Sequence, residues 1–165
     1  MEQLGIFYGS STGDTERVAN IIKDTIGKAK ASVHDILESS VEDIKQHSFL
    51  IFGIPTWGIG NLQEDWEEFI THLKSVDFKG KKVALFGLGD QESYPDTFAD
   101  ALGILFDELQ HTGCCILGTC SVKGYKYVHS KAERNGKFVG LVLDERNQPE
   151  LTRKRVSSWI QSLGL

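Results

Sequence analysis

The chain has 165 residues, of which 40% are hydrophobic and 25% are charged, and only three are proline. This size and composition are typical of one globular domain with a complete core, and they exclude a chain made mostly of disordered linkers. The formal net charge of -5 argues against a nucleic acid as the main partner, because binding to phosphates along a strand needs clustered lysine and arginine.

Strand-like apolar runs alternate with helical patterns along the chain. Strands are predicted at residues 4–8, 31–35, 49–54 and 83–87, and a last strand starts at 114–117 and resumes at 138–143. Helices are predicted between and after them, at residues 14–28, 41–46, 62–73, 96–111 and 152–163. This alternation is typical of right-handed crossovers in an α/β protein. It predicts an open, doubly wound parallel sheet of five strands with helices on both faces.

The turn between the first strand and the first helix has the composition of an anion-binding site. It reads GSSTGDT over residues 9–15 and contains no lysine or arginine. The free N–H groups of a helix N-terminus favour an anion, and the hydroxyls of Ser10, Ser11, Thr12 and Thr15 can add donors. Because the lysine of a nucleoside triphosphatase is missing, the turn suits a phosphate that is held and not transferred. A capped helix without a ligand is the alternative interpretation.

Two later loops each place one large aromatic side chain at the same edge of the sheet. Trp57 lies in the loop after the third strand, and Tyr94 lies in the loop after the fourth. In an open parallel sheet, ligands bind outside the carboxyl ends of the strands, where these loops meet the first turn. Two aromatic side chains there make a slot for a flat ring. We therefore expect a ligand that is planar at one end and phosphorylated at the other, rather than aromatic side chains that only pack on neighbouring loops.

Other residue patterns limit the remaining functions. The three cysteines, Cys114, Cys115 and Cys120, and the five scattered histidines lack the spacing of a metal site, so no metal is expected. The cysteines are expected to be reduced and mostly buried. No apolar run is long enough to span a bilayer, and the chain enters its first strand without a signal region, so we expect a cytoplasmic location.

Several sequence blocks together resemble the flavodoxins, specifically the long-chain class, which binds flavin mononucleotide (FMN). The resemblance covers nearly the whole chain and implies a single flavodoxin-like domain over residues 1–165 with strand order 2-1-3-4-5. Residues 119–137 correspond to the loop that interrupts the fifth strand in long-chain members. The blocks are FYGSSTGDTE at 7–16, PTW at 55–57, DW at 65–66, GLGDQ at 87–91 followed by Tyr94, GY at 124–125, SKA at 130–132, NGKFVGL at 135–141 and LDE at 143–145.

The resemblance also implies which residues bind FMN, and it implies no catalytic residue and no metal ligand. The turn after the first strand would hold the phosphate, and Thr56 would contact the ribityl–phosphate side. Trp57 and Tyr94 would sandwich the isoalloxazine ring, the backbone of Gly58 and Ile59 would face flavin N5, and the loop after the fourth strand would meet the pyrimidine edge. The expected cofactor-binding residues are Ser10, Ser11, Thr12, Gly13, Asp14, Thr15, Pro55, Thr56, Trp57, Gly58, Ile59, Gly60, Leu88, Gly89, Asp90, Tyr94, Thr97, Phe98 and Ala99.

The function implied by the resemblance is that of a low-potential one-electron carrier, an electron-transfer protein and not an enzyme. Its expected partners are redox proteins that bind transiently, such as a flavodoxin/ferredoxin-NADP reductase and acceptor oxidoreductases; a nucleic acid and a membrane are not expected, and the chain is expected to be a monomer. An acidic rim around the flavin edge would attract basic partners. The rim would comprise Glu64, Asp65, Glu67, Glu68, Asp90, Glu92, Asp96 and Asp100.

Two alternatives share this architecture. An FMN-dependent NAD(P)H:quinone reductase of flavodoxin-like fold needs room for nicotinamide over the flavin, where Trp57 and Tyr94 are expected to cover both faces. A response regulator needs a phosphorylatable aspartate after the third strand, where this chain has Pro55, Thr56 and Trp57.

The chain departs from the long-chain pattern at three places. The inserted loop is basic, which leaves the choice of partner open. Arg146 stands where the pattern usually has an acid that can reach the ribityl hydroxyls, so this contact is lost or replaced. Pro95 follows Tyr94 and restricts its backbone to extended angles, which stiffens the support of the ring. The basic residues of the loop are Lys123, Lys126, Lys131, Arg134 and Lys137.

Overall fold

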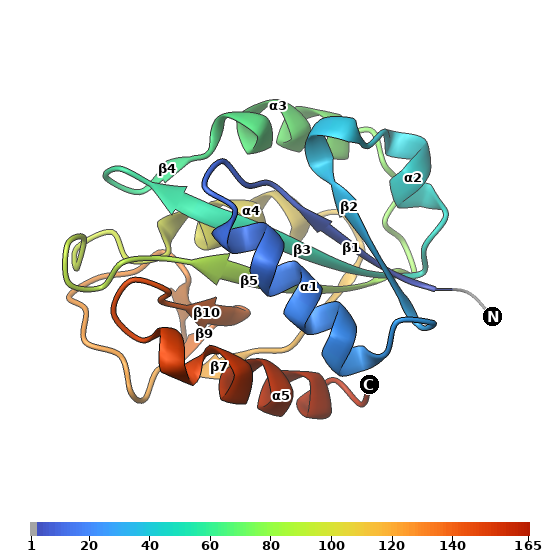
Figure 1. Ribbon diagram of the computed structural model, residues 1–165. Coiled ribbons are helices and arrows are strands. Elements are labelled where there is room, and N and C mark those ends of the chain that lie inside the picture. Colours follow the sequence, from blue (N-terminus) through green and yellow to red (C-terminus); the bar gives the residue numbers. More distant parts are fainter. Residues whose placement is uncertain (1–2) are drawn as a thin grey trace.

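Parallel strands form the centre of the structure, a computed structural model that describes residues 3–165 (Figure 1). Within these residues the main sheet has seven strands, and its central path runs in the order β10-β5-β3-β1-β2. All neighbours along this path are parallel, so every carboxyl end lies at one edge of the sheet. The strands are β1 (Leu4–Tyr8), β2 (Ala31–Asp35), β3 (Phe49–Trp57), β5 (Lys82–Leu88) and β10 (Leu141–Leu143).

The fifth position of the sheet is shared by two short strands. β6 (Cys115–Leu117) pairs with Lys82–Ala84 of β5, and β10 pairs with Phe86–Leu88 of the same strand. The predicted order 2-1-3-4-5 is therefore confirmed, with β6 and β10 together in the last place. Between them the chain forms a separate three-stranded antiparallel sheet of β7 (Cys120–Ser121), β9 (Lys137–Phe138) and β8 (Glu133–Arg134).

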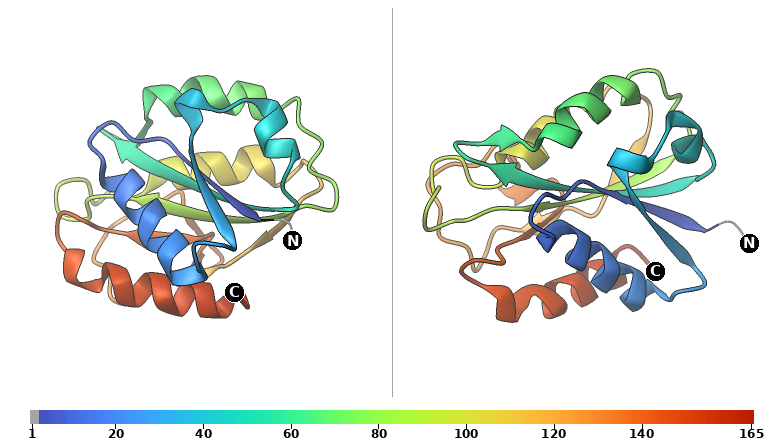
Figure 2. Two further views of the ribbon diagram at one scale, coloured as in Figure 1. Left: turned by 45° about the vertical axis from the view of Figure 1, so that its right-hand side comes forward. Right: turned by 45° about the horizontal axis from the view of Figure 1, so that its top comes forward.

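Helices cover both faces of the main sheet. Figure 2 shows from two further directions that α1 (Asp14–Ile26) and α5 (Thr152–Ser162) lie together on one side, whereas α3 (Glu64–Leu73) and α4 (Asp100–Leu109) lie on the other. Successive strand residues point to opposite faces, so Ile6 packs in the core under α1 and α5 while Phe7 packs in the core under α3 and α4. The short helices η1 (Ile36–Glu38), α2 (Val41–Lys45) and η2 (Pro149–Leu151) lie in connections.

The predicted last strand resumes at Leu141 and not at residue 138, because Lys137 and Phe138 pair with β7 in the small sheet. Two further predicted boundaries differ from the structure because of contacts that a local pattern does not encode. β3 continues to Trp57, beyond the predicted end at residue 54, because β4 (Asn61–Leu62) pairs antiparallel with Thr56 and Trp57. α4 begins at Asp100, not at residue 96, because Ala99 adopts the left-handed region with a φ of 53°. Both differences lengthen or reshape loops at the carboxyl edge of the sheet.

The prediction that the cysteines are mostly buried was wrong. All three cysteines are free, but Cys115 is exposed and the other two are half-buried, since β6 pairs with β5 at the margin of the sheet. Across residues 3–165, no helix combines the length and the apolar character that crossing a membrane requires.

Candidate functional site

A cavity of about 380 Å³ opens at the carboxyl edge of the sheet. Its wall is built by the loops that follow β1, β3, β5 and β10, which is where an open parallel sheet binds ligands. The lining residues are Ser10, Ser11, Thr12, Asp14, Thr15, Pro55, Thr56, Trp57, Gly58, Leu88, Gly89, Asp90, Ser93, Tyr94, Thr97, Ala99, Glu145 and Arg146.

The loop between β1 and α1 presents an open helix N-terminus to this cavity. Gly13 precedes α1 with a φ of 93°, and its N–H donates to Ser10 Oγ over 2.9 Å. Within the described residues, no side chain caps the helix, and Arg17 N–H bonds back to Gly13 O at 3.0 Å. The N–H groups of the first turn are thus left for a ligand, beside the hydroxyls of Ser11 and Thr12.

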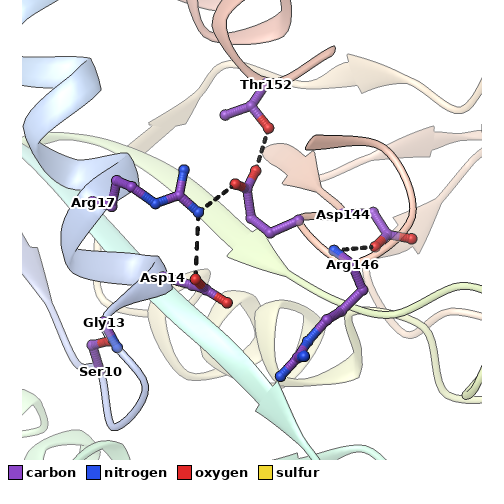
Figure 3. Close-up of polar contacts among 8 residues, drawn as sticks. Ser10, Gly13, Asp14, Arg17, Asp144, Arg146 and Thr152 are labelled. Carbon is purple, nitrogen blue, oxygen red and sulfur yellow. Dashed lines mark hydrogen bonds and ion pairs between the residues drawn. The ribbon is translucent and has the colours of Figure 1, made fainter. Parts of the chain in front are cut away.

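Arg17 forms ion pairs with two acidic residues at the same helix start (Figure 3). Arg17 Nη2 lies 3.3 Å from Asp14 Oδ1 and 2.7 Å from Glu145 Oε2. The side-chain hydrogen bond from Arg17 to Glu145 raises the pKa of the guanidinium, which therefore stays charged. Thr152 Oγ1 donates a further hydrogen bond to Glu145. Arg17 therefore offsets part of the negative charge of Asp14 and Glu145 where an anion would approach α1.

The β3–β4 hairpin carries the first aromatic side chain of the site. Trp57 ends β3 and remains 43% exposed, so its ring is available to a ligand. Gly58 and Gly60 turn the chain with φ values of 50° and 80°, which glycine adopts at little cost. Thr56 Oγ1 accepts a hydrogen bond of 3.2 Å from the Ala101 N–H in the first turn of α4, which fixes the hairpin against that helix.

The second aromatic side chain lies on the loop between β5 and α4. Tyr94 is also 43% exposed, and its N–H donates to Asp90 O over 2.9 Å. The N–H groups of Val128 and His129 both donate to Pro95 O, at 2.8 and 3.0 Å. The chain between β7 and β8 therefore supports the Tyr94 loop from outside.

A fully buried carboxylate ties this loop to the end of β10. Asp144 Oδ2 accepts hydrogen bonds from Gln91 N–H at 3.0 Å, Gln91 Nε2 at 2.8 Å and Asn147 Nδ2 at 2.9 Å. Asn147 Nδ2 also donates to Asp90 Oδ1 over 2.8 Å. Burial opposes ionisation of Asp90, but hydrogen bonds from the Ser93 backbone and from Asn147 outweigh it and lower the pKa of this carboxyl. Asp90 is thus a fixed negative charge in the wall.

Most of the expected cofactor-binding residues line the cavity, and four do not. Gly13 shapes the helix start, Ile59 lies 78% exposed at the tip of the hairpin, and Gly60 packs against Asp100. Phe98 is fully buried, with ring centroids 5.3 Å from Tyr127 and 5.9 Å from Tyr125, because it anchors the loop in the core.

Three lining residues were not among the expected ones: Ser93, Glu145 and Arg146. Glu145 and Arg146 follow β10 at the same edge as the other loops. The predicted last strand ends at residue 143, so the rule that selected the other loops applies to this one as well, but only the loops after the first, third and fourth strands were selected. Asp100, expected in an exposed acidic rim, is buried, and its Oδ1 accepts a hydrogen bond of 2.8 Å from Lys131 N–H.

Comparison with known proteins gives one consistent result. The family model described as flavodoxin matches residues 6–159 of the chain. A flavodoxin of Nostoc sp. strain PCC 7120 is 49% identical over 162 residues, covering 98% of this chain and 95% of the relative. Flavodoxin 1 of Escherichia coli K12 is 47% identical over 164 residues, covering 99% of this chain and 93% of the relative.

A solved structure agrees with these relatives. The crystal structure of Fusobacterium nucleatum flavodoxin bound to flavin mononucleotide has a TM-score of 0.91 to this fold at 33% sequence identity. The match covers 99% of this chain and 98% of that one. The likeness thus includes the loops that surround the cavity as well as the sheet.

Proposed function

The chain belongs to the flavodoxin family, and from this premise we propose that it binds FMN in the cavity and carries electrons, one at a time, between redox proteins. The strongest support for this proposal is the combination of groups that a single cavity brings together. One end has an uncapped helix N-terminus with hydroxyl side chains, and the wall also holds two half-exposed aromatic rings. A phosphorylated ligand with a flat ring system fits that combination.

The cavity also has a suitable size and polarity for FMN. Its volume of about 380 Å³ falls in the range of small-molecule sites. In this proposal the residues from Ser10 to Thr15 hold the phosphate, and Thr56 lies along the ribityl chain. Trp57 and Tyr94 cover the ring, while the backbone of Leu88, Gly89 and Asp90 meets its pyrimidine edge. Bound FMN supplies the one-electron redox chemistry.

The residues around the cavity then set the reduction potential of the bound FMN. Trp57 and Tyr94 exclude water from the ring faces and make added negative charge less well solvated. Asp90, ionised and fixed in the wall, repels such charge further. Gly58, already at a positive φ, can present its peptide group to the ring without strain. The weak solvation of added charge and the repulsion by Asp90 both lower the reduction potential of bound FMN, which favours a strongly reducing carrier.

The mouth of the cavity suits transient contact with other proteins. Trp57 and Tyr94 line the cavity and, with Ile59 of the hairpin, expose apolar surface, and α3, which follows β4 in the chain, begins with the acidic side chains Glu64 and Glu67. An acidic, partly apolar mouth favours fast, weak encounters with basic redox partners such as a flavodoxin/ferredoxin-NADP reductase. We propose that the chain acts there as a monomer and as a carrier without enzymatic activity of its own.

The experiment that tests this function separates a carrier from a quinone reductase. Full-length protein loaded with FMN is mixed with NADPH and a quinone, first alone and then with a catalytic amount of ferredoxin-NADP reductase. We expect no NADPH oxidation above background without the reductase, and reduction of the bound FMN once it is added. Sustained NADPH oxidation by the protein alone would contradict the proposal and support the quinone reductase.

A further inference from the structure

Arg146 is a cation in the cavity wall whose charge has no partner among the residues that the structure describes. It lies in the turn between β10 and η2, where its N–H donates to Asp144 Oδ1 over 3.1 Å. Its guanidinium makes neither an ion pair nor a hydrogen bond with any residue from 3 to 165. In Figure 3 the side chain extends away from Asp144 and Thr152, and the dashed line at Arg146 joins its backbone nitrogen to Asp144.

Among the described residues, none of the acidic side chains of the wall forms an ion pair with Arg146. Asp14 and Glu145 are both paired with Arg17, at 3.3 and 2.7 Å. Asp90 accepts hydrogen bonds from Ser93 N–H at 2.9 Å and from Asn147 at 2.8 Å. The backbone of Arg146 is held by the buried Asp144, so the residue remains at the cavity while its guanidinium stays free.

We propose that Arg146 is a specificity-determining residue that recognises the negative charge of FMN and favours it over uncharged riboflavin. This inference rests on the proposed binding of FMN. The hydroxyls and helix N–H groups of the β1–α1 loop are neutral donors, so the loop itself brings no full positive charge to a phosphate. Arg146 supplies one, and its attraction strengthens when a bound ligand displaces water from the cavity.

The test measures binding of two ligands that differ in one charged group. The full chain is freed of flavin and titrated with FMN and with riboflavin, following flavin fluorescence, at ionic strengths of about 0.01 M and about 1 M, where the Debye length is about 30 and 3 Å. The variants are Arg146→Gln, which removes the charge, and Arg146→Lys, which keeps it. Arg153→Gln is the matched control, because Arg153 is exposed on α5 and does not line the cavity.

We expect Arg146→Gln to weaken FMN binding by about three- to tenfold at low salt and by less than about twofold at high salt. Riboflavin binding should change by less than about twofold at either salt concentration, since riboflavin lacks the phosphate charge. Arg146→Lys should restore most of the FMN affinity, and Arg153→Gln should leave it unchanged. Circular dichroism spectra of all variants should match the parent, since the exposed Arg146 side chain makes no hydrogen bond or ion pair with the described residues.

Three results would overturn the inference. Equal loss of FMN and riboflavin affinity would mean that Arg146 acts on the shared ribityl or ring atoms and not on charge. Unchanged affinity for both ligands, or an equal effect of Arg153→Gln, would remove its specific role. A parent protein that binds neither flavin would overturn the proposed function itself, which is a separate and recognisable outcome.

Discussion

Asp144 shows how a residue outside the cavity wall can set the shape of the site. Besides the three donors on Oδ2, its Oδ1 accepts the N–H groups of Arg146 and Asn147, at 3.1 and 3.0 Å. A buried carboxylate is stable only when it is satisfied in this way. The pattern of the sequence placed this residue in the block LDE but did not indicate these bonds, because its donors come from loops whose paths depend on the whole fold.

His34 makes the folding stability depend on pH. Its ring stacks on Phe7 with centroids 4.6 Å apart, and its Nε2 lies 2.8 Å from Ser32 Oγ. Burial, then the neighbouring His47, lower its pKa, and Lys23 adds to this while Asp43 opposes it. In the unfolded chain a histidine titrates at about 6.5, so the unfolded state takes up this proton first. The contribution of His34 is therefore full above that pH and is lost as the pH falls toward its folded pKa.

We predict that His34→Gln reduces this pH dependence. The free energy of unfolding, measured by urea titration at about pH 7.5 and about pH 5, should fall less on acidification in the variant than in the parent. His129→Gln is the control, because His129 is exposed and its ring has no stacking contact among the described residues. A pH dependence in His34→Gln equal to that of the parent would show that His34 is not the responsible group.

At the scale of elements, the burial of β3 and β5 follows directly from the sequence, whereas their pairing is what the family resemblance implies. Both strands are nearly continuous apolar runs, which predicts burial on both faces, and both lie inside the sheet. The start of α4 could not be predicted from the sequence, because Ala99 adopts a positive φ that its side chain does not indicate. The burial of Phe98 is a further consequence of the aromatic cluster formed by Tyr125, Tyr127 and Phe138, which are distant in sequence.

Glu145 links α1 to α5, because it pairs with Arg17 of α1 and accepts a hydrogen bond from Thr152 of α5. The contribution of this link to stability can be tested. The Glu145 side chain is 4% exposed, while that of its partner Arg17 is 52% exposed. Glu145→Gln removes the charge and should lower the free energy of unfolding by about 1–2 kcal/mol, near the low end for a buried pair because Arg17 can be solvated. Urea unfolding at neutral pH measures this loss. Glu150→Gln, an exposed change in η2, should cost less than about 0.5 kcal/mol, and equal effects of the two changes would rule out the link.

At the scale of the whole molecule, the order of the strands fixed the edge at which ligands bind. The alternation of apolar runs and helical patterns was sufficient to predict this edge and three of its four loops. The fourth loop, with Glu145 and Arg146, was not interpreted as a binding loop, although the predicted last strand ends at residue 143, as β10 does. Local periodicity did not show that Lys137 and Phe138 leave the main sheet and pair in the small one.

Stepwise reduction of the FMN-loaded protein, followed by visible absorption, tests directly whether the protein binds FMN and transfers one electron at a time. We expect the full chain to bind FMN tightly. The bound flavin should then be reduced in two separate one-electron steps, with a long-wavelength absorption band that rises and then disappears. Failure to bind FMN, or reduction in a single two-electron step without that band, would contradict this prediction.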